Sequence, residues 1–199
     1  PTLWEGTIVA MAAAAIAEGL LSKVDCGERG KRIEVQVADR RRDIALIDAA
    51  FSSLTYTGAK ALLHPEEILG VLATQAHPAS IGFSALAGSV EMVDPEAPYG
   101  LFVEPDWEKD GYIAALSAGT MVEFGVAKSE RLAVGETFSF PAPRDGTIAL
   151  DGEREVTFRQ GEKLTLSLTR KGPRKVDVPR AVALAAERGF FRRRERQSR

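Results

Sequence analysis

Short apolar runs, separated by glycine and proline, recur through the second half of the chain. Earlier, Ile33, Val35 and Val37 alternate with polar residues, as in a half-buried strand. After residue 80 we expect strands at residues 81–83, 100–103, 112–115, 121–126, 137–140, 147–150, 155–158 and 164–168. Closely spaced short strands predict an antiparallel sandwich or barrel.

Helical signals occur at the start, the middle and the end of the chain. Thr2 to Glu5 has the form of a capping box, and an alanine-rich helix follows that we expect to be largely buried and to end near residues 19–22. His64-Pro65-Glu66-Glu67 predicts a second helix, running to about residue 75. Pro179 begins a last helix that ends at Gly189. The fold class is therefore α+β, a mostly antiparallel β-sandwich with an N-terminal, a middle and a C-terminal helix.

Composition excludes several classes of protein. A chain of 199 residues can bury a sizeable core, and a single cysteine, Cys26, excludes a disulfide framework. The net charge of −2 argues against nucleic acid as a partner. The longest apolar run, residues 8–17, is too short to span a membrane and lacks the flanks of a signal peptide. We expect a cytoplasmic protein, one domain over residues 1–191, and a frayed basic tail over residues 192–199.

Asp48 interrupts a nearly continuous apolar run over residues 44–51, which we interpret as one buried strand after a charged turn at residues 39–43. A buried carboxylate is costly unless it is paired or hydrogen-bonded, so Asp48 is a candidate site residue. The alternative is a strand-end residue, or a salt bridge to one of the arginines at positions 40–42.

Asp151 and Gly152 join two alternating runs and predict a tight hairpin turn. The simplest interpretation is a turn alone. The functional one is that the turn presents a carboxylate into a cleft, for a ribose or a phosphate-bound metal.

The segment 81–89 combines small residues with hydroxyl groups, and Gly82, Ser84, Gly88 and Ser89 are its candidate ligand contacts. A bulged strand and turn is the alternative. His64 and His77 each precede proline and are interpreted as cap or loop residues rather than as bases. No glycine-rich phosphate-binding loop of the known patterns occurs, so nothing in this chain alone supplies a phosphate cradle.

Several segments together carry a family resemblance: residues 43–48, 58–61, 74–85, 150–156 and 178–181. Their most specific parts are Leu150-Asp151-Gly152-Glu153-Arg154-Glu155 and Ala76-His77-Pro78. The chain resembles the C-terminal part of the ATP–NAD kinase family, in the branch that contains acetoin catabolism protein X. Asp151 and Gly152 match the Asp-Gly turn of that family. Ile47-Asp48 stands where the true NAD kinases have an Asn-Glu pair.

The resemblance implies a β-rich domain that completes a nucleotide site. It also implies ATP and Mg²⁺ as cofactors, NAD as a possible substrate, a partner N-terminal domain that carries a Gly-Gly-Asp-Gly-Thr loop, and a homo-oligomer. That loop does not occur here, so we expect the chain to start after it and to have no kinase activity alone. The alternative is a non-catalytic nucleotide-binding or oligomerisation module with a regulatory role.

Overall fold

The computed structural model describes residues 5–39, 41–54 and 64–192. The contacts divide the chain into two compact units, where the sequence predicts one domain over residues 1–191. The smaller unit combines Pro1–Arg29 with Pro173–Arg199, and the larger is Gly30–Gly172. The division arises because the two terminal helices bury their apolar faces against each other and form a small core of their own.

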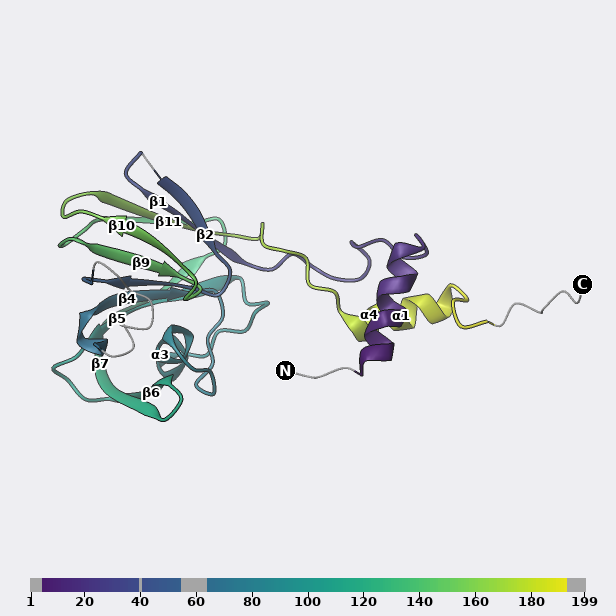
Figure 1. Ribbon diagram of the computed structural model, residues 1–199, viewed down its shortest axis with the longest axis horizontal. Helices are drawn as coiled ribbons and strands as arrows, with labels where there is room; N and C mark the ends of the chain where they lie inside the picture. The colour runs from purple at the N-terminus through teal and green to yellow at the C-terminus, as the bar shows by residue number, and fades with distance from the viewer. Residues whose placement is uncertain (1–4, 40, 55–63, 193–199) are drawn as a thin grey trace, which may run out of the picture. The chain divides into compact units, whose positions relative to one another are not determined.

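The smaller unit consists mainly of α1 (Gly6–Ala17) and α4 (Val178–Glu187), which cross in Figure 1. Alanine side chains supply much of the contact, which lets the helices approach closely. The buried residues are Ala12, Ala15, Leu21, Cys26, Ala181 and Ala185. Only Ala12 and Ala15 of α1 are buried, so the expectation of a largely buried helix is wrong.

The ends of these helices follow local chemistry. Asp177 caps α4 by accepting the Arg180 backbone N–H at 3.0 Å, and the helix ends before Gly189, as predicted. At α1 the Glu5 carboxylate caps the helix by accepting the Thr7 backbone N–H at 3.0 Å. Glu5 therefore replaces the predicted capping box, whose Thr2 lies outside the described residues. Of the predicted basic tail, the described part ends at Arg192.

The larger unit contains two antiparallel sheets (Figure 1). The four-stranded sheet has the order β2-β1-β11-β8, with bounds Arg41–Ala45, Arg32–Val37, Lys163–Thr169 and Thr137–Pro141. The seven-stranded sheet has the order β10-β9-β3-β4-β5-β7-β6, with bounds Arg154–Phe158, Gly146–Leu150, Asp48–Ser52, Ile68–Ala73, Tyr99–Asp106, Thr120–Ala133 and Tyr112–Ser117.

The seven-stranded sheet is buried on both faces in its central strands. One face meets the four-stranded sheet, and Phe51 and Phe102 lie in the core between them. The other face carries α3 (Phe83–Val90), and Ala50 and Leu101 belong to the core on that side. The α+β fold with two antiparallel sheets and three helices is therefore confirmed. None of the helices in the described part of the chain is long and apolar enough to cross a membrane.

The middle helix is not where the sequence predicts it. His64 to Glu67 begins only a 3-10 turn, η1 (Pro65–Glu67), and the chain then continues as β4. β4 lies at the centre of the seven-stranded sheet, and a strand buried on both faces has a continuous apolar sequence that periodicity cannot distinguish from a helix.

The middle helix is α3, in the segment 81–89 that we interpret from sequence as a strand and turn. Phe83, Leu86 and Ala87 have helical spacing and pack against the sheet. Gly82 precedes the helix with a φ of 95°, a left-handed conformation that favours glycine.

The predicted single strand over residues 44–51 is also wrong, because two strands from different sheets share it. β2 ends at Ala45, the chain bends at Leu46 and Ile47, and β3 begins at Asp48. The turn predicted over residues 39–43 is shorter in the structure, because β2 already begins at Arg41.

Candidate functional site

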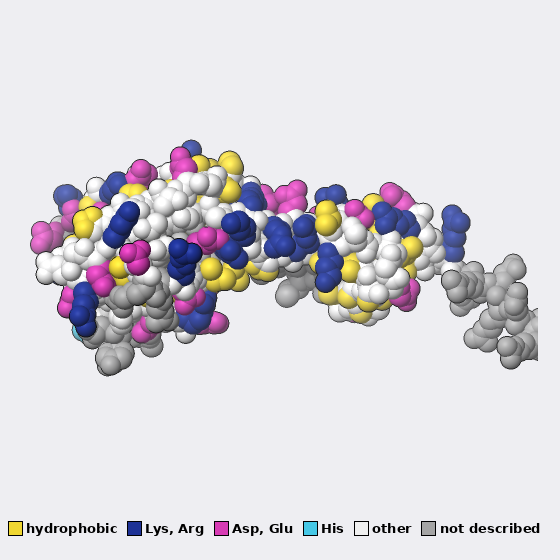
Figure 2. Space-filling view, turned by 90° about the horizontal axis from the view of Figure 1, so that it is seen from above, with side chains coloured by type: hydrophobic (Ala, Val, Ile, Leu, Met, Phe, Trp, Pro, Cys, Tyr) yellow, Lys and Arg dark blue, Asp and Glu magenta, His cyan; other side chains and the backbone are white. Residues whose placement is uncertain are grey.

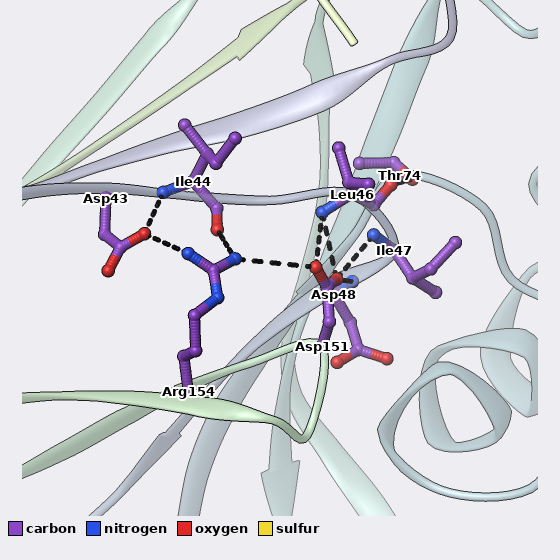
Figure 3. Close-up of polar contacts among 8 residues, drawn as sticks. All are labelled: Asp43, Ile44, Leu46, Ile47, Asp48, Thr74, Asp151 and Arg154. Atoms are coloured by element: carbon purple, nitrogen blue, oxygen red, sulfur yellow. Dashed lines mark hydrogen bonds and ion pairs between the residues drawn. The ribbon is translucent and has the colours of Figure 1, made fainter. Parts of the chain in front are cut away.

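The bend between β2 and β3 is held by the Asp151 carboxylate (Figure 3). The carboxylate accepts the backbone N–H groups of Leu46 at 2.9 Å, Ile47 at 2.7 Å and Asp48 at 3.3 Å. Asp151 has a φ of 54° and Gly152 a φ of 70°, so the predicted tight turn between β9 and β10 is confirmed. Backbone amides therefore bind this carboxylate, which the functional interpretation of the sequence, but not the simplest one, presents into a cleft.

Three further hydrogen bonds fix the same bend. The Asp151 backbone N–H donates to the Asp48 carbonyl at 3.0 Å. Directly after β4, the Thr74 hydroxyl donates to the Leu46 carbonyl at 2.7 Å, and the Thr74 backbone N–H donates to the Ile47 carbonyl at 2.8 Å. The backbone N–H and carbonyl groups of the bend thus have hydrogen-bond partners, and these hydrogen bonds fix the position of Asp48.

Arg154 of β10 connects this region to β2. Its guanidinium pairs with the Asp43 carboxylate and donates to the Ile44 carbonyl at 2.6 Å. It also lies 4.0 Å from the Asp151 carboxylate, where it offsets part of that negative charge (Figure 3). Because β2 and β10 belong to different sheets, Arg154 joins the two layers beside the bend.

Asp48 is a buried acid with incomplete pairing. Asp48 is 7% exposed and is the first residue of β3, as the strand-end alternative predicts. For the alternative salt bridge, Arg40 and the side chain of Arg41 lie outside the described residues, and Arg42 makes no ion pair with Asp48. Its carboxyl group accepts the Ser84 backbone N–H, whereas Oδ1 has no hydrogen-bond partner among the described residues. Burial raises the pKa of Asp48 to about 7, and the negative charge of Asp151 adds to this, while the Ser84 hydrogen bond opposes it.

A groove of about 800 Å³ lies on the α3 side of the sheet, next to Asp48. Ser84, in the first turn of α3, and Ile47, in the bend, both line it. The other lining residues are Gln75, Ala76, His77, Ser80, Ile81, Met92, Val93, Asp94 and Pro95. The lining thus combines an apolar surface with a few hydroxyl, amide and carboxylate groups, as in small-molecule sites.

The structure brings some predicted site residues to this groove and gives others a packing role. Ser84 lines the groove, and Asp48 contacts Ser84. A side chain at Gly88 would overlap the main chain of His77, so this glycine permits close packing of α3. The Ser89 hydroxyl donates to the carbonyls of Ala85 at 3.0 Å and Ile113 at 2.8 Å, within the α3–β6 contact.

Other lining residues were not predicted. His77 lines the groove, and its Nδ1 also accepts the Ala79 N–H at 3.0 Å, which agrees with its interpretation as a loop residue. Asp94 has no local sequence signal. Its loop is held by Lys31, whose ammonium donates to the carbonyls of Asp94 at 3.0 Å and Tyr99 at 2.6 Å. Burial, more than the nearby Arg170, lowers the pKa of Lys31 to about 8.

The groove does not fit the phosphates of ATP with Mg²⁺. Among the residues that line it no lysine or arginine occurs. No group of three or more histidine, cysteine or acidic side chains in the described part of the chain could hold a metal ion. Positive charge and Mg²⁺ are what stabilise transferring phosphates. The lining suits an uncharged ligand that carries hydroxyl groups.

Comparisons with known proteins agree with the family resemblance. The family model of the acetoin catabolism protein X C-terminal domain matches residues 31–171. Acetoin catabolism protein X of Cupriavidus necator is 31% identical over 199 residues, an alignment that covers 96% of this chain and 55% of that protein. The chain thus spans about half the length of this relative.

A solved structure, yeast NADH kinase complexed with NADH, is also similar, with a TM-score of 0.46 and 13% identity over 87% of this chain and 51% of that one. The family match covers most of the chain and nearly all of its larger unit. The chain therefore belongs to the family of the acetoin catabolism protein X C-terminal domain.

Proposed function

We propose that the larger unit forms the acceptor side of a kinase site, in which Asp48 binds and deprotonates a hydroxyl group of a small molecule. The observation that carries the proposal is the Asp48 carboxyl group. It is buried beside a groove, its Oδ1 has no partner in the described part of the chain, and its pKa is about 7. A general base works best when its pKa is near the working pH.

The surroundings of Asp48 suit a proton acceptor. Its carboxyl group lies at the N-terminal end of α3, where the Ser84 N–H and the positive end of the helix dipole stabilise the charged form. Asp151 and burial stabilise the protonated form. Oδ1 is itself buried, so the acceptor reaches it when the groove-lining neighbours Ile47 and Ser84 move aside.

The phosphate donor belongs to another part of the same site. In this proposal ATP and Mg²⁺ bind to residues outside this chain, consistent with a curated relative about twice as long. Small polyols are the first acceptors to test, because the lining suits an uncharged ligand with hydroxyl groups. NAD is tested next, and its pyrophosphate would then need cations from outside this chain, as ATP does. The proposed setting is a cytoplasmic homo-oligomer that includes the N-terminal partner domain.

One observation favours the second candidate, a non-catalytic nucleotide-binding or oligomerisation module with a regulatory role. The Asp151 carboxylate accepts three backbone amides and therefore serves the structure of the bend. If Asp48 also serves only the structure, its replacement changes ligand affinity or assembly and leaves no catalytic defect.

The test is Asp48→Asn in the full gene product, with Asp110→Asn, an exposed loop substitution, as the matched control. Phosphorylation of NAD and of small polyols by ATP is measured, together with ligand-induced thermal shifts. We expect Asp48→Asn to lower turnover by about 100-fold or more, with thermal shifts close to those of the control. Turnover equal to that of Asp110→Asn contradicts the proposal.

The chain of residues 1–199 is assayed in parallel. We expect it to have no kinase activity, because the lining of its groove offers no cation to the phosphates. Phosphorylation of any dinucleotide or small alcohol by this chain alone would show that the donor site is misassigned, while leaving the role of Asp48 open to the substitution above.

A further inference from the structure

A second cavity lies between the two sheets, on the opposite face of the seven-stranded sheet from Asp48. Its volume is about 440 Å³. Residues of β3, β4 and β5 form one wall, and residues of β8, the edge strand of the smaller sheet, form another. This cavity shares no lining residue with the groove beside Asp48, so its function is independent of the kinase proposal.

Five phenylalanines from both sheets line the cavity. Phe138 and Phe140 stand two residues apart on β8, with ring centroids 5.2 Å apart. Phe138 lies 5.4 Å from Phe102, and Phe140 lies 5.5 Å from Phe51 in an edge-to-face arrangement. Phe158 of β10 completes the group. These rings already contact one another, so a ligand ring would pack against the edges and faces that they leave toward the cavity.

Charged groups occur only among the exposed lining residues. Lys128 lies 4.8 Å from the Phe138 ring centroid, and its ammonium pairs with Glu130 at 2.6 Å. Glu104 is the register partner of Lys128 on β5. Arg144 is exposed, and no ion pair is found for it among the described residues. In Figure 2, acidic and basic side chains are interspersed over the visible face of this unit.

The volume of this cavity is that of a small-molecule site. The cavity opens to solvent beside exposed residues such as Arg144, and sites for small molecules start at about 300 Å³. An apolar lining does not hold ordered water, because water needs polar partners. A ligand with an apolar body therefore fits the inner part of the cavity, and an anionic group fits the cation at Arg144.

We propose that the cavity between the sheets binds a planar aromatic carboxylate, with its ring among the phenylalanines and its carboxylate on the Arg144 guanidinium. Arginine matches a carboxylate with two parallel hydrogen bonds, which sets the orientation of the ligand. The aromatic ring distinguishes this ligand from a straight-chain acid, since edge and face contacts with Phe138 and Phe140 need a planar partner.

The test uses calorimetric titration of the full chain with 2-naphthoate, its uncharged analogue 2-naphthamide, and octanoate. We expect 2-naphthoate to bind more tightly than the other two. Arg144→Gln should weaken 2-naphthoate binding by about 10-fold or more, the loss of a charge-assisted hydrogen bond, and change 2-naphthamide binding by less than about twofold. Arg159→Gln, another exposed arginine outside the cavity, is the matched control.

Leu69→Trp provides a second variant, because this half-buried lining residue can fill the cavity without changing its charge. We expect it to reduce the binding of both naphthalene compounds while circular dichroism stays that of the parent chain. The proposal is overturned if no 2-naphthoate binding is detected at millimolar concentration, if Arg144→Gln and Arg159→Gln behave alike, or if octanoate binds more tightly than 2-naphthoate.

Discussion

Asp48→Asn should change how the stability of the larger unit depends on pH. The pKa of Asp48 rises from its ordinary value of 3.8 to about 7 in the folded protein, because of burial first and of the nearby Asp151 second. Between these values the folded state holds a proton that the unfolded state has released. The free energy of unfolding therefore falls as the pH rises from about 4 to about 7.

The size of the effect follows from the two pKa values. Each pH unit between them corresponds to about 1.4 kcal/mol, so the full loss is about 4 kcal/mol, of which about 3 kcal/mol falls between pH 5 and pH 8. In the variant position 48 does not titrate. The parent chain should therefore lose about 3 kcal/mol more than Asp48→Asn over that interval.

Urea unfolding at pH 5 and pH 8 measures this difference. Trp107 is a suitable probe, because its indole N–H donates to the Ile68 carbonyl at 3.0 Å and its ring packs on Phe124. A Trp4→Phe background isolates its fluorescence, since the chain has two tryptophans. Asp110→Asn is the control. A difference between parent and variant below about 1 kcal/mol would refute the assignment of Asp48 as a buried acid with a raised pKa.

Two further substitutions test the packing around the site with the same fluorescence assay. Asp151→Ala leaves the amides of the bend without their acceptor and should destabilise the larger unit by about 3 kcal/mol. The control, Glu153→Ala in the same turn, should have little effect. Equal effects of the two substitutions would contradict the role given to the Asp151 carboxylate. Gly88→Ala should cost about 2 kcal/mol, because its methyl group would overlap the main chain of His77. Its control is Gly6→Ala in α1, where no atom lies within 4 Å of the added methyl group; a Gly88→Ala chain as stable as that control would show that α3 can shift.

Local signals in the sequence predicted the elements that are governed by local chemistry. The alternation of Ile33, Val35 and Val37 gave a half-buried strand, and Pro179 and Gly189 marked the ends of α4. The Asp151-Gly152 turn was also predicted, because positive φ angles favour these residue types whatever surrounds them.

The predicted secondary structure is wrong where burial on both faces of an element removes the hydrophobic periodicity from its sequence. β4 was predicted as a helix, since a central strand and a buried helix have similar apolar sequences. The sequence predicts a strand at residues 81–83 and no helix at α3, because its glycine and small residues, Gly88 among them, reflect close packing against residue 77 rather than a turn. The break at Leu46 and Ile47 has no local cause, because its hydrogen-bond acceptor lies about a hundred residues away in the chain.

The sequence by itself determined the family, the sandwich of short strands and Asp48 as an unusual buried acid. Those properties depend on residue identity and on short-range periodicity. Only the tertiary structure decided what the acids do: Asp151 holds a bend, and Asp48 faces the first turn of a helix, with one oxygen that no described residue contacts by a hydrogen bond. Such roles depend on desolvation and on contacts between distant strands, and these exist only once the sheets have assembled.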